Sequence, residues 1–262
     1  MSRLRGPHGA LTTLLRGRRA AEGGIVLGYH DVLPMRTSRP WDVSSEQLVD
    51  HIDAVRQAGF EIVPMSAMAR ELAAGRPVAR LAAVTFDDAL VGVLDAVKTL
   101  GKRSVPVTVY ATCSSMGRSP SWWPDARRVL TALELRRVAG LEHVEIGSHS
   151  WSHVSLVDVD DETLRREICD SRRYLSTLVE APVETFAYPS GHHDARVRAA
   201  TRRAGYLGAV TFQNGRVAMT SDRFALPRFT GGAHLSRARF RYHLLRPVQA
   251  WPDIESVTVA SA

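Results

Sequence analysis

Residues 81–88 read Leu-Ala-Ala-Val-Thr-Phe-Asp-Asp, an apolar run that ends in two adjacent carboxylates, Asp87 and Asp88. A short apolar run bounded by polar residues predicts a buried strand of the kind found in parallel sheets. Because side chains alternate along a strand, two consecutive acids at its end point in different directions. One carboxylate can therefore bind a metal ion while its neighbour acts on water.

Further apolar runs lie along the chain, and helical patterns separate most of them. Ser44 and Gln47 have capping-box spacing before apolar residues at helical periodicity, so a helix is predicted over 44–58. A second helix is predicted over 160–179. This alternation predicts an α/β fold, a (β/α) barrel of seven or eight strands with its functional residues at the strands' carboxyl ends. Since no clear helix separates the last two runs, irregular closure is expected. The other predicted strands are 25–30, 61–65, 104–112, 144–150, 185–191, 207–212 and 224–230.

Two histidines four residues apart, His149 and His153, follow another predicted strand. One carboxylate and two neutral imidazoles suit zinc and leave a coordination position open, so Asp88 and the two histidines are the candidate ligands. Asp87 would then be the base that takes a proton from the attacking water. Alone, paired acids often cap the helix that follows, here from Ala89. The position of both motifs at strand ends favours the metal site.

These motifs resemble those of the polysaccharide deacetylases of the NodB-homology type, carbohydrate esterase family 4. The family's Thr-Phe-Asp-Asp-Gly is matched at 85–88 with Ala89 in the glycine place, and its His-Ser/Thr-x-x-His is matched at 149–153. Its Phe-Arg-x-Pro-Tyr-Gly reads Phe-Ala-Tyr-Pro-Ser-Gly at 186–191. The resemblance implies a distorted barrel that holds Zn²⁺, or another divalent transition metal such as Co²⁺. It implies Asp87 as the base and, as ligands, Asp88, His149 and His153.

The third motif departs from the family pattern. The family's backbone N–H at the tyrosine place holds the oxyanion, which implies the N–H of Ser190 here. The family's arginine orients the catalytic aspartate, but Ala187 stands in its place, and Arg228 is a candidate substitute. The family's last motifs are not recognisable downstream, so no motif assigns the general acid. The motif residues counted as candidate substrate contacts are Tyr188, Pro189, Gly191 and Arg228.

His30 ends the predicted strand 25–30 and is the candidate general acid or substrate contact. The chain resembles a subset of the family that includes exopolysaccharide poly-N-acetylglucosamine deacetylases, through its Tyr-His, Phe-Ala-Tyr-Pro-x-Gly and Leu-Pro-Arg segments. A purely structural histidine is the alternative for His30. His192 and His193 are further candidates for the acid, or exposed loop residues without a role.

Trp122 and Trp123 follow a predicted strand and therefore lie at the same rim. Their rings either stack on a sugar face or anchor the next helix. The loop 31–41, rich in Pro and Arg, is in the same way either a lid over the substrate or a plain connection.

Length and composition indicate one catalytic domain, 25–262, after a basic arm, 1–24. The chain has 262 residues, of which 45% are hydrophobic, enough for one sizeable core. Cys113 and Cys169 lack metal spacing and are interpreted as ordinary thiols, which favours a reducing compartment. Neither a secretory apolar segment nor a spanning run is recognisable, so a cytoplasmic protein is expected.

The net charge of +7 allows nucleic acid, anionic lipid or a phosphate-bearing substrate as a partner. Since no nucleic-acid motif is present, no nucleic acid is expected, and a membrane surface or a phosphate-linked sugar is preferred. A solvated basic face is the alternative. Besides the arm, the basic residues and interleaved aromatics are Arg237, Arg239, Phe240, Arg241, Tyr242, Arg246 and Trp251.

The function predicted from the sequence is a metal-dependent hydrolase that removes acetyl from an N-acetylated amino sugar. Two alternatives stay open. One keeps the fold and the metal but acts as a deformylase, or as an amidase on a non-sugar substrate. The other is a catalytically silent carbohydrate-binding protein.

Overall fold

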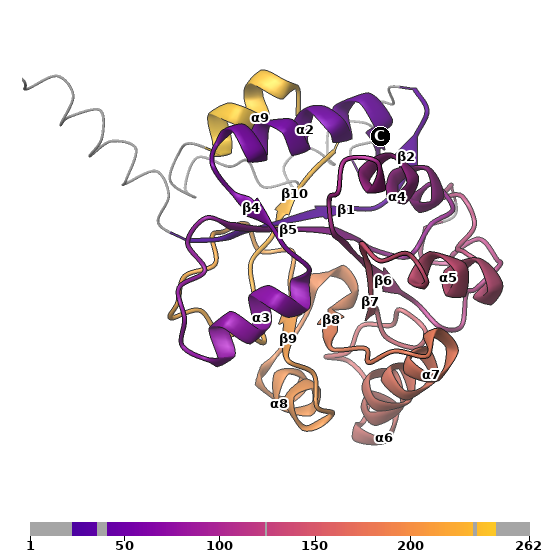
Figure 1. Cartoon of the computed structure of the whole chain (residues 1–262). Helices are drawn as coiled ribbons and strands as arrows, with labels where there is room; N and C mark the ends of the chain where they lie inside the picture. Colours follow the sequence, from indigo (N-terminus) through magenta and orange to yellow (C-terminus); the bar gives the residue numbers. More distant parts are fainter. Residues whose placement is uncertain (1–22, 36–40, 124, 233–234, 245–262) are drawn as a thin grey trace, which may run out of the picture.

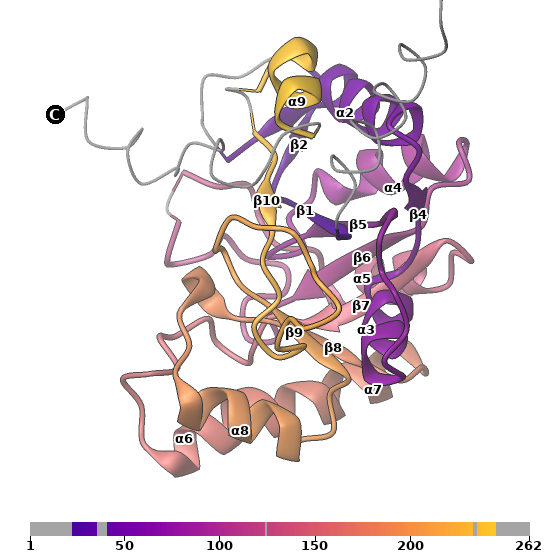
Figure 2. The same ribbon diagram turned by 90° about the vertical axis from the view of Figure 1, so that its left-hand side faces the viewer.

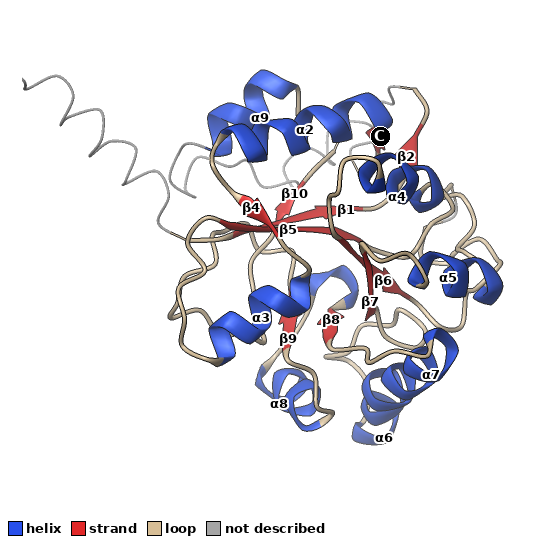
Figure 3. Cartoon of the chain, in the orientation of Figure 1, coloured by secondary structure: helices blue, strands red, loops and turns tan. Residues whose placement is uncertain are grey.

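The parallel strands of this chain curl into a barrel whose helices lie outside it (Figures 1 and 3). The computed structural model describes residues 23–35, 41–123, 125–232 and 235–244. Neighbouring strands run in the order β10-β1-β5-β6-β7-β8-β9, and the short β4 pairs with the start of β5. The strands are β1 (Ile25–Tyr29), β4 (Glu61–Ile62), β5 (Leu81–Phe86), β6 (Val107–Ala111), β7 (Val144–Ser148), β8 (Thr185–Ala187), β9 (Gly208–Val210) and β10 (Phe229–Thr230).

The barrel closes irregularly, as the missing helix between the last two runs predicts. Leu226 donates its N–H to Ala209 O and accepts at its carbonyl from Thr211 N, both at 2.9 Å. Three residues further on, β10 begins and pairs with β1, with Phe229 opposite Leu27. One short segment thus joins the two edges of the curled sheet.

Helices cover the outside of the barrel (Figures 1 and 2). Ser44 and Gln47 form the predicted capping box of α2, and the predicted helix 160–179 is interrupted by a π-helical turn, η1. A small parallel pair, β2 (Val32–Leu33) and β3 (Val43–Ser44), precedes α2. The helical segments are α2 (Ser45–Gln57), α3 (Met65–Ala73), α4 (Val93–Gly101), α5 (Ala132–Ala139), α6 (Asp161–Arg165), η1 (Arg166–Asp170), α7 (Ser171–Val179), η2 (Pro189–Gly191, 3₁₀), α8 (Ala195–Arg203) and α9 (Arg237–Leu244).

α3 closes the amino-terminal end of the barrel. Its Met65 and Met68 pack with inward-facing strand residues such as Val26 and Tyr110 in a second, smaller core. Its first N–H groups are bonded too, since Met65 N donates to Thr108 Oγ1 at 3.0 Å and Ser66 N donates to the carboxylate of Glu145 at 3.2 Å. The carboxyl ends of the strands are left for a site.

The structure also bears on the residues outside the strands that the sequence singled out. Gly24 is buried and exchanges two hydrogen bonds with Val217, so it belongs to the domain and not to an arm. Phe240 is buried and stacks on His51 at 4.1 Å, so its ring is not a free binding aromatic. Both cysteines are free thiols. Every helix in the described residues is too short or too polar to traverse a bilayer. Residues 1–22 and 36–40, Arg246 and Trp251 lie outside the described residues.

Candidate metal and catalytic site

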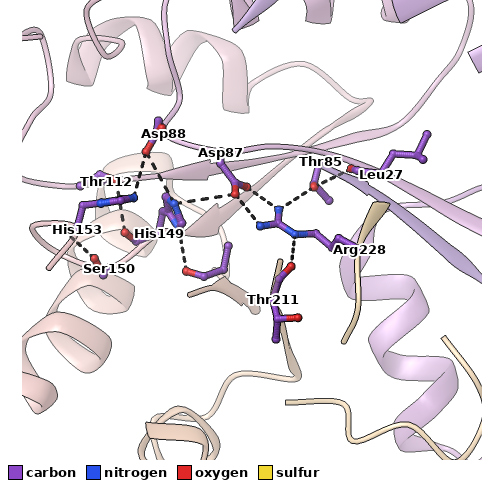
Figure 4. A network of polar contacts seen from close by, with 11 residues as sticks. Leu27, Thr85, Asp87, Asp88, Thr112, His149, Ser150, His153, Thr211 and Arg228 are labelled. Carbon is purple, nitrogen blue, oxygen red and sulfur yellow. Dashed lines mark hydrogen bonds and ion pairs between the residues drawn. The ribbon is translucent and has the colours of Figure 1, made fainter. Parts of the chain in front are cut away.

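The three candidate ligands converge at the carboxyl ends of β5 and β7 (Figure 4). Asp88 follows β5, His149 follows β7, and His153 comes from the loop beyond. Asp88 Oδ1 lies 3.8 Å from His149 Nε2 and 3.6 Å from His153 Nε2, and one ligand atom from each residue lies within 4.8 Å of the others. Tetrahedral zinc holds neighbouring ligand atoms about 3.3 Å apart. The three side chains therefore need only small movements to share one ion.

The two imidazoles are in the form that binds a cation, whereas Asp88 must lose a proton to do so. His149 Nδ1 lies 2.8 Å from Ala187 O, which can only accept, so Nδ1 carries the hydrogen and Nε2 is free to ligate. Burial lowers the pKa of both His149 and His153, so both are neutral. Burial, and then the charge of Asp87, raise the pKa of Asp88 to about 8. Its Oδ1 is buried without a hydrogen-bond partner among the described residues, an arrangement that a bound cation relieves.

Backbone strain gathers at this rim. Asp88 and Ala89 have φ values of 63° and 52°, and Ser150, His153 and Ser190 are also left-handed, at 69°, 63° and 53°. Such conformations are costly for residues with a Cβ and are often found at functional sites. The value at Ala89 explains why glycine suits that place in the motif.

Asp87 is held by Arg228. Both side chains are fully buried, and two guanidinium nitrogens donate to the two carboxylate oxygens at 2.7 Å each. Arg228 Nε donates to Thr211 O at 2.8 Å, and its Nη1 also donates to Thr85 Oγ1 at 3.2 Å (Figure 4). Arg228 thus orients Asp87, as predicted for a substitute for the family's arginine, whose place Ala187 takes. Its assignment as a substrate contact is wrong, because the guanidinium has no exposed surface.

Asp87 is ionised despite its burial. Burial alone raises the pKa of this carboxyl, but the charge and hydrogen bonds of Arg228, together with His149, bring it well below the ordinary range. A carboxylate that stays charged and fixed in direction can accept a proton from water beside it.

A cavity of about 650 Å³ opens above these residues. His30 forms part of its wall, with its ring stacked on Phe212 at a centroid distance of 5.6 Å. Burial lowers the pKa of His30 to about 4, so the free protein carries a neutral imidazole there at neutral pH. The lining residues are His30, Trp41, Asp88, Trp122, Trp123, His153, Ser190, Gly191, His192, Phe212, Gln213, Asn214 and Thr230.

Both tryptophans line this cavity. Trp122 stacks on the ring of His153 at 4.1 Å and 7°, and Trp123 meets His30 edge-on at 5.6 Å. Each ring therefore forms part of the cavity wall and also packs against a site histidine, a contact that neither role weighed from the sequence includes. Stacking of these rings on a sugar face stays a prediction.

Other motif residues lie elsewhere. Tyr188 is fully buried and donates its hydroxyl to Phe224 O at 2.9 Å, so its assignment as a substrate contact is wrong. Pro189 is buried and is absent from the cavity lining, which removes it as well. Of the histidines after the motif, His192 lines the cavity, whereas His193 packs beside Tyr188 at 5.0 Å.

Sequence reasoning missed part of the cavity wall. Trp41 falls within the predicted loop 31–41, and Phe212 ends a predicted strand, so neither carries a motif of its own. Gln213 and Asn214 carry no motif. The one signal was position, since residues that follow a strand of a (β/α) barrel belong to its active rim.

A family model described as polysaccharide deacetylase matches residues 74–209. This chain belongs to the polysaccharide deacetylase family. The family match indicates a deacetylase that acts on a sugar-like substrate. The matched segment contains Asp87, Asp88, His149 and His153 but ends before Arg228. The residue that holds the Asp87 carboxylate therefore comes from outside the matched segment.

Several solved structures share the fold. A Streptococcus pyogenes deacetylase, PplD, solved in complex with acetate, is 18% identical with a TM-score of 0.73, covering 86% of this chain and 99% of its own. IcaB from Ammonifex degensii is 20% identical with a TM-score of 0.71, covering 86% and 98%. A de-N-acetylase from Aggregatibacter actinomycetemcomitans is 14% identical with a TM-score of 0.69, covering 84% and 98%. No curated protein matches the chain by sequence.

Proposed function

We propose that the chain is a metal-dependent N-deacetylase that hydrolyses the acetamido group of an N-acetylated amino sugar. One observation carries this proposal: a fixed, ionised carboxylate lies directly beside a three-residue ligand set. Asp87 Oδ2 is 4.0 Å from His149 Nε2, which in turn is 3.8 Å from Asp88 Oδ1. A protein that only binds sugar has no need for a buried, arginine-oriented carboxylate next to a metal site.

Zinc, or another divalent transition metal such as cobalt, held by Asp88, His149 and His153 supplies a Lewis acid and lowers the pKa of water. Asp87 accepts a proton from the water that attacks the amide carbonyl, and Arg228 keeps its oxygens aimed at that water. The backbone N–H of Ser190, at the cavity wall, donates to the developing oxyanion. The C–N bond breaks, giving acetate and a free amine.

We assign proton delivery to the leaving amine to His30. The imidazole is neutral before the reaction, so it takes up a proton from solvent before the C–N bond breaks, and the proton that Asp87 accepts from the attacking water returns to solvent when the products leave. The charge of Asp87 is the largest influence that raises the pKa of His30. Its place in the wall of the cavity that Asp88 and His153 also line suits this role. The indoles of Trp122 and Trp123 offer flat apolar faces to a pyranose ring.

The test is to measure acetate and formate release by the zinc-loaded protein from free, oligomeric, nucleotide-linked and lipid-linked N-acyl amino sugars. Chelator-sensitive acetate release from one of these classes is expected. Asp88→Ala should lose metal and activity together, whereas Asp87→Asn should keep the metal and lose activity by about 10²-fold or more. A fully active Asp87→Asn protein would overturn the assignment of the base, and formate release alone would favour a deformylase.

A further inference from the structure

The two histidine ligands lie at the ends of one strained loop, residues 149–153. Ser150 and His153 are both left-handed within it. His149 is fixed at its ring by Ala187 O, and its carbonyl accepts from Thr112 Oγ1 at 3.4 Å (Figure 4). The place of His153 relative to His149 then depends on the path of the backbone between them.

Glu167 holds the middle of that path. Its side chain is almost fully buried, with 3% of the residue exposed. Oε2 accepts from two consecutive backbone groups, Trp151 N at 2.9 Å and Ser152 N at 2.8 Å, and Oε1 accepts from Ser152 Oγ at 2.6 Å. The Glu167 carboxylate thus accepts three hydrogen bonds from Trp151 and Ser152, the two residues that precede His153.

The π-helical turn η1 presents Glu167 to the loop. Ser171 Oγ donates to Glu167 O at 2.6 Å, and Tyr206 OH donates to Ile168 O at 3.1 Å, so hydroxyl groups satisfy carbonyls of the widened turn. Ser148 Oγ, on the residue before His149, donates to Ser171 Oγ at 3.0 Å. The helical segment 166–171 therefore hydrogen-bonds the chain both before and after His149. π-Helical turns are frequent at functional sites.

We propose that Glu167 is a positioning residue of the metal centre. Its carboxylate fixes the backbone of residues 151 and 152, so that His153 meets Asp88 and His149 in ligating geometry. This inference rests on the metal site of the proposed function, though not on the identity of the substrate. Groups that orient metal ligands from outside the coordination sphere typically change metal affinity when they are removed.

Glu145 offers a matched control. It too is a carboxylate that accepts from a backbone N–H and a hydroxyl, Ser66 N at 3.2 Å and Thr108 Oγ1 at 3.0 Å. It lies at the amino-terminal end of the strands, away from the ligands. Replacing it costs comparable hydrogen bonds without touching the loop 149–153.

The experiment compares zinc dissociation constants, measured by calorimetric competition with a chelator, and urea unfolding of the metal-free proteins. Glu167→Ala should weaken zinc binding about 10- to 100-fold. Glu167→Gln should keep most of the affinity, because its amide oxygen can accept both N–H groups while its NH₂ group donates to Ser152 Oγ. Glu145→Ala should unfold at lower urea and bind zinc like the wild type. The absorption spectrum of the cobalt-loaded protein should change for Glu167→Ala alone.

The proposal would be overturned if Glu167→Ala bound zinc as tightly as the wild type. It would also be overturned if Glu145→Ala weakened zinc binding as much as Glu167→Ala does. If Glu167→Ala does not fold, Glu167→Asp, with its carboxylate drawn back by one methylene, takes its place with the same expectation. A wild type that binds zinc but hydrolyses nothing in the panel would refute the proposed function and leave the role of Glu167 intact. A wild type that binds no zinc would refute both.

Discussion

Replacement of Arg228 by methionine tests the buried pair at the centre of the site. The change leaves the carboxylate of Asp87, which is fully buried, without its two 2.7 Å bonds and without a neighbouring cation. Breaking such a pair from one side costs about 3–5 kcal/mol. Since domains of this kind are stable by about 5–15 kcal/mol, Arg228→Met should fold but unfold at clearly lower urea.

The loss should depend on pH. In the wild-type protein the pKa of folded Asp87 is lowered. The ion pair therefore contributes its full share of the folding free energy at any pH above the ordinary carboxyl pKa. That contribution is lost only when the pH falls through the lowered pKa of the folded protein. In Arg228→Met, burial without the cation raises the pKa, so Asp87 becomes protonated as the pH falls. The stability difference between the two proteins should therefore be largest near pH 8 and shrink toward pH 5.

The double variant Asp87→Asn, Arg228→Met supplies the control, because it removes the unpaired charge along with its partner. It should be more stable than the sum of the single effects predicts, by about 0.5–3 kcal/mol. The activity of Arg228→Met should fall about 10²-fold, since a base that has lost its orientation is misplaced by about 1 Å. A stability loss under about 1 kcal/mol, or one that does not change with pH, would refute the reasoning about the pair.

Two further predictions concern the metal and the oxyanion donor. In chelator, stability should fall as pH rises from about 5 to about 8 and then level off, because the unfolded chain ionises Asp88 near the ordinary carboxyl pKa whereas the folded protein keeps the proton until its raised pKa of about 8. Zinc or Asp88→Asn should abolish that slope in urea titrations, and a flat chelator profile would contradict the prediction. Gly191→Ala should lower kcat about 10²-fold by displacing the Ser190 N–H, because φ is 72° and a Cβ would meet Phe212 N at 2.7 Å. Gly205→Ala, with φ of 85° remote from the cavity, should lose stability without losing kcat, and equal kcat losses in both variants would contradict the oxyanion assignment.

Much of the barrel follows from local patterns. The apolar runs mark the strands because buried parallel strands need apolar residues on both faces, and Ser44 with Gln47 marks the start of α2. The candidate ligands follow as well, since the carboxyl ends of parallel strands share one edge. The strands end earlier than the runs, for example at Phe86, because the polar residues after them turn into the site.

Other features depend on tertiary structure that no local pattern encodes. The π-helical turn at Arg166–Asp170 inserts one residue into an otherwise regular helical period, which the sequence pattern does not resolve. The motif predicts that Tyr188 faces substrate, yet the strand's alternation turns it into the core. The cavity wall formed by Trp41 and Phe212 brings together loops distant in sequence, and only barrel closure places them side by side.

The pairing of Asp87 with Arg228 makes the orientation of this carboxylate depend on a late part of the chain. The two residues are 141 positions apart, and Arg228 lies between Leu226, which is hydrogen-bonded to Ala209 of β9, and β10, which pairs with β1. If Asp87 is the base of the proposed reaction, a chain truncated before residue 228 should be inactive, because it keeps Asp87 but lacks the guanidinium that orients it. Such a chain also lacks the segment that links the two edges of the sheet, so truncation should cost stability and activity together.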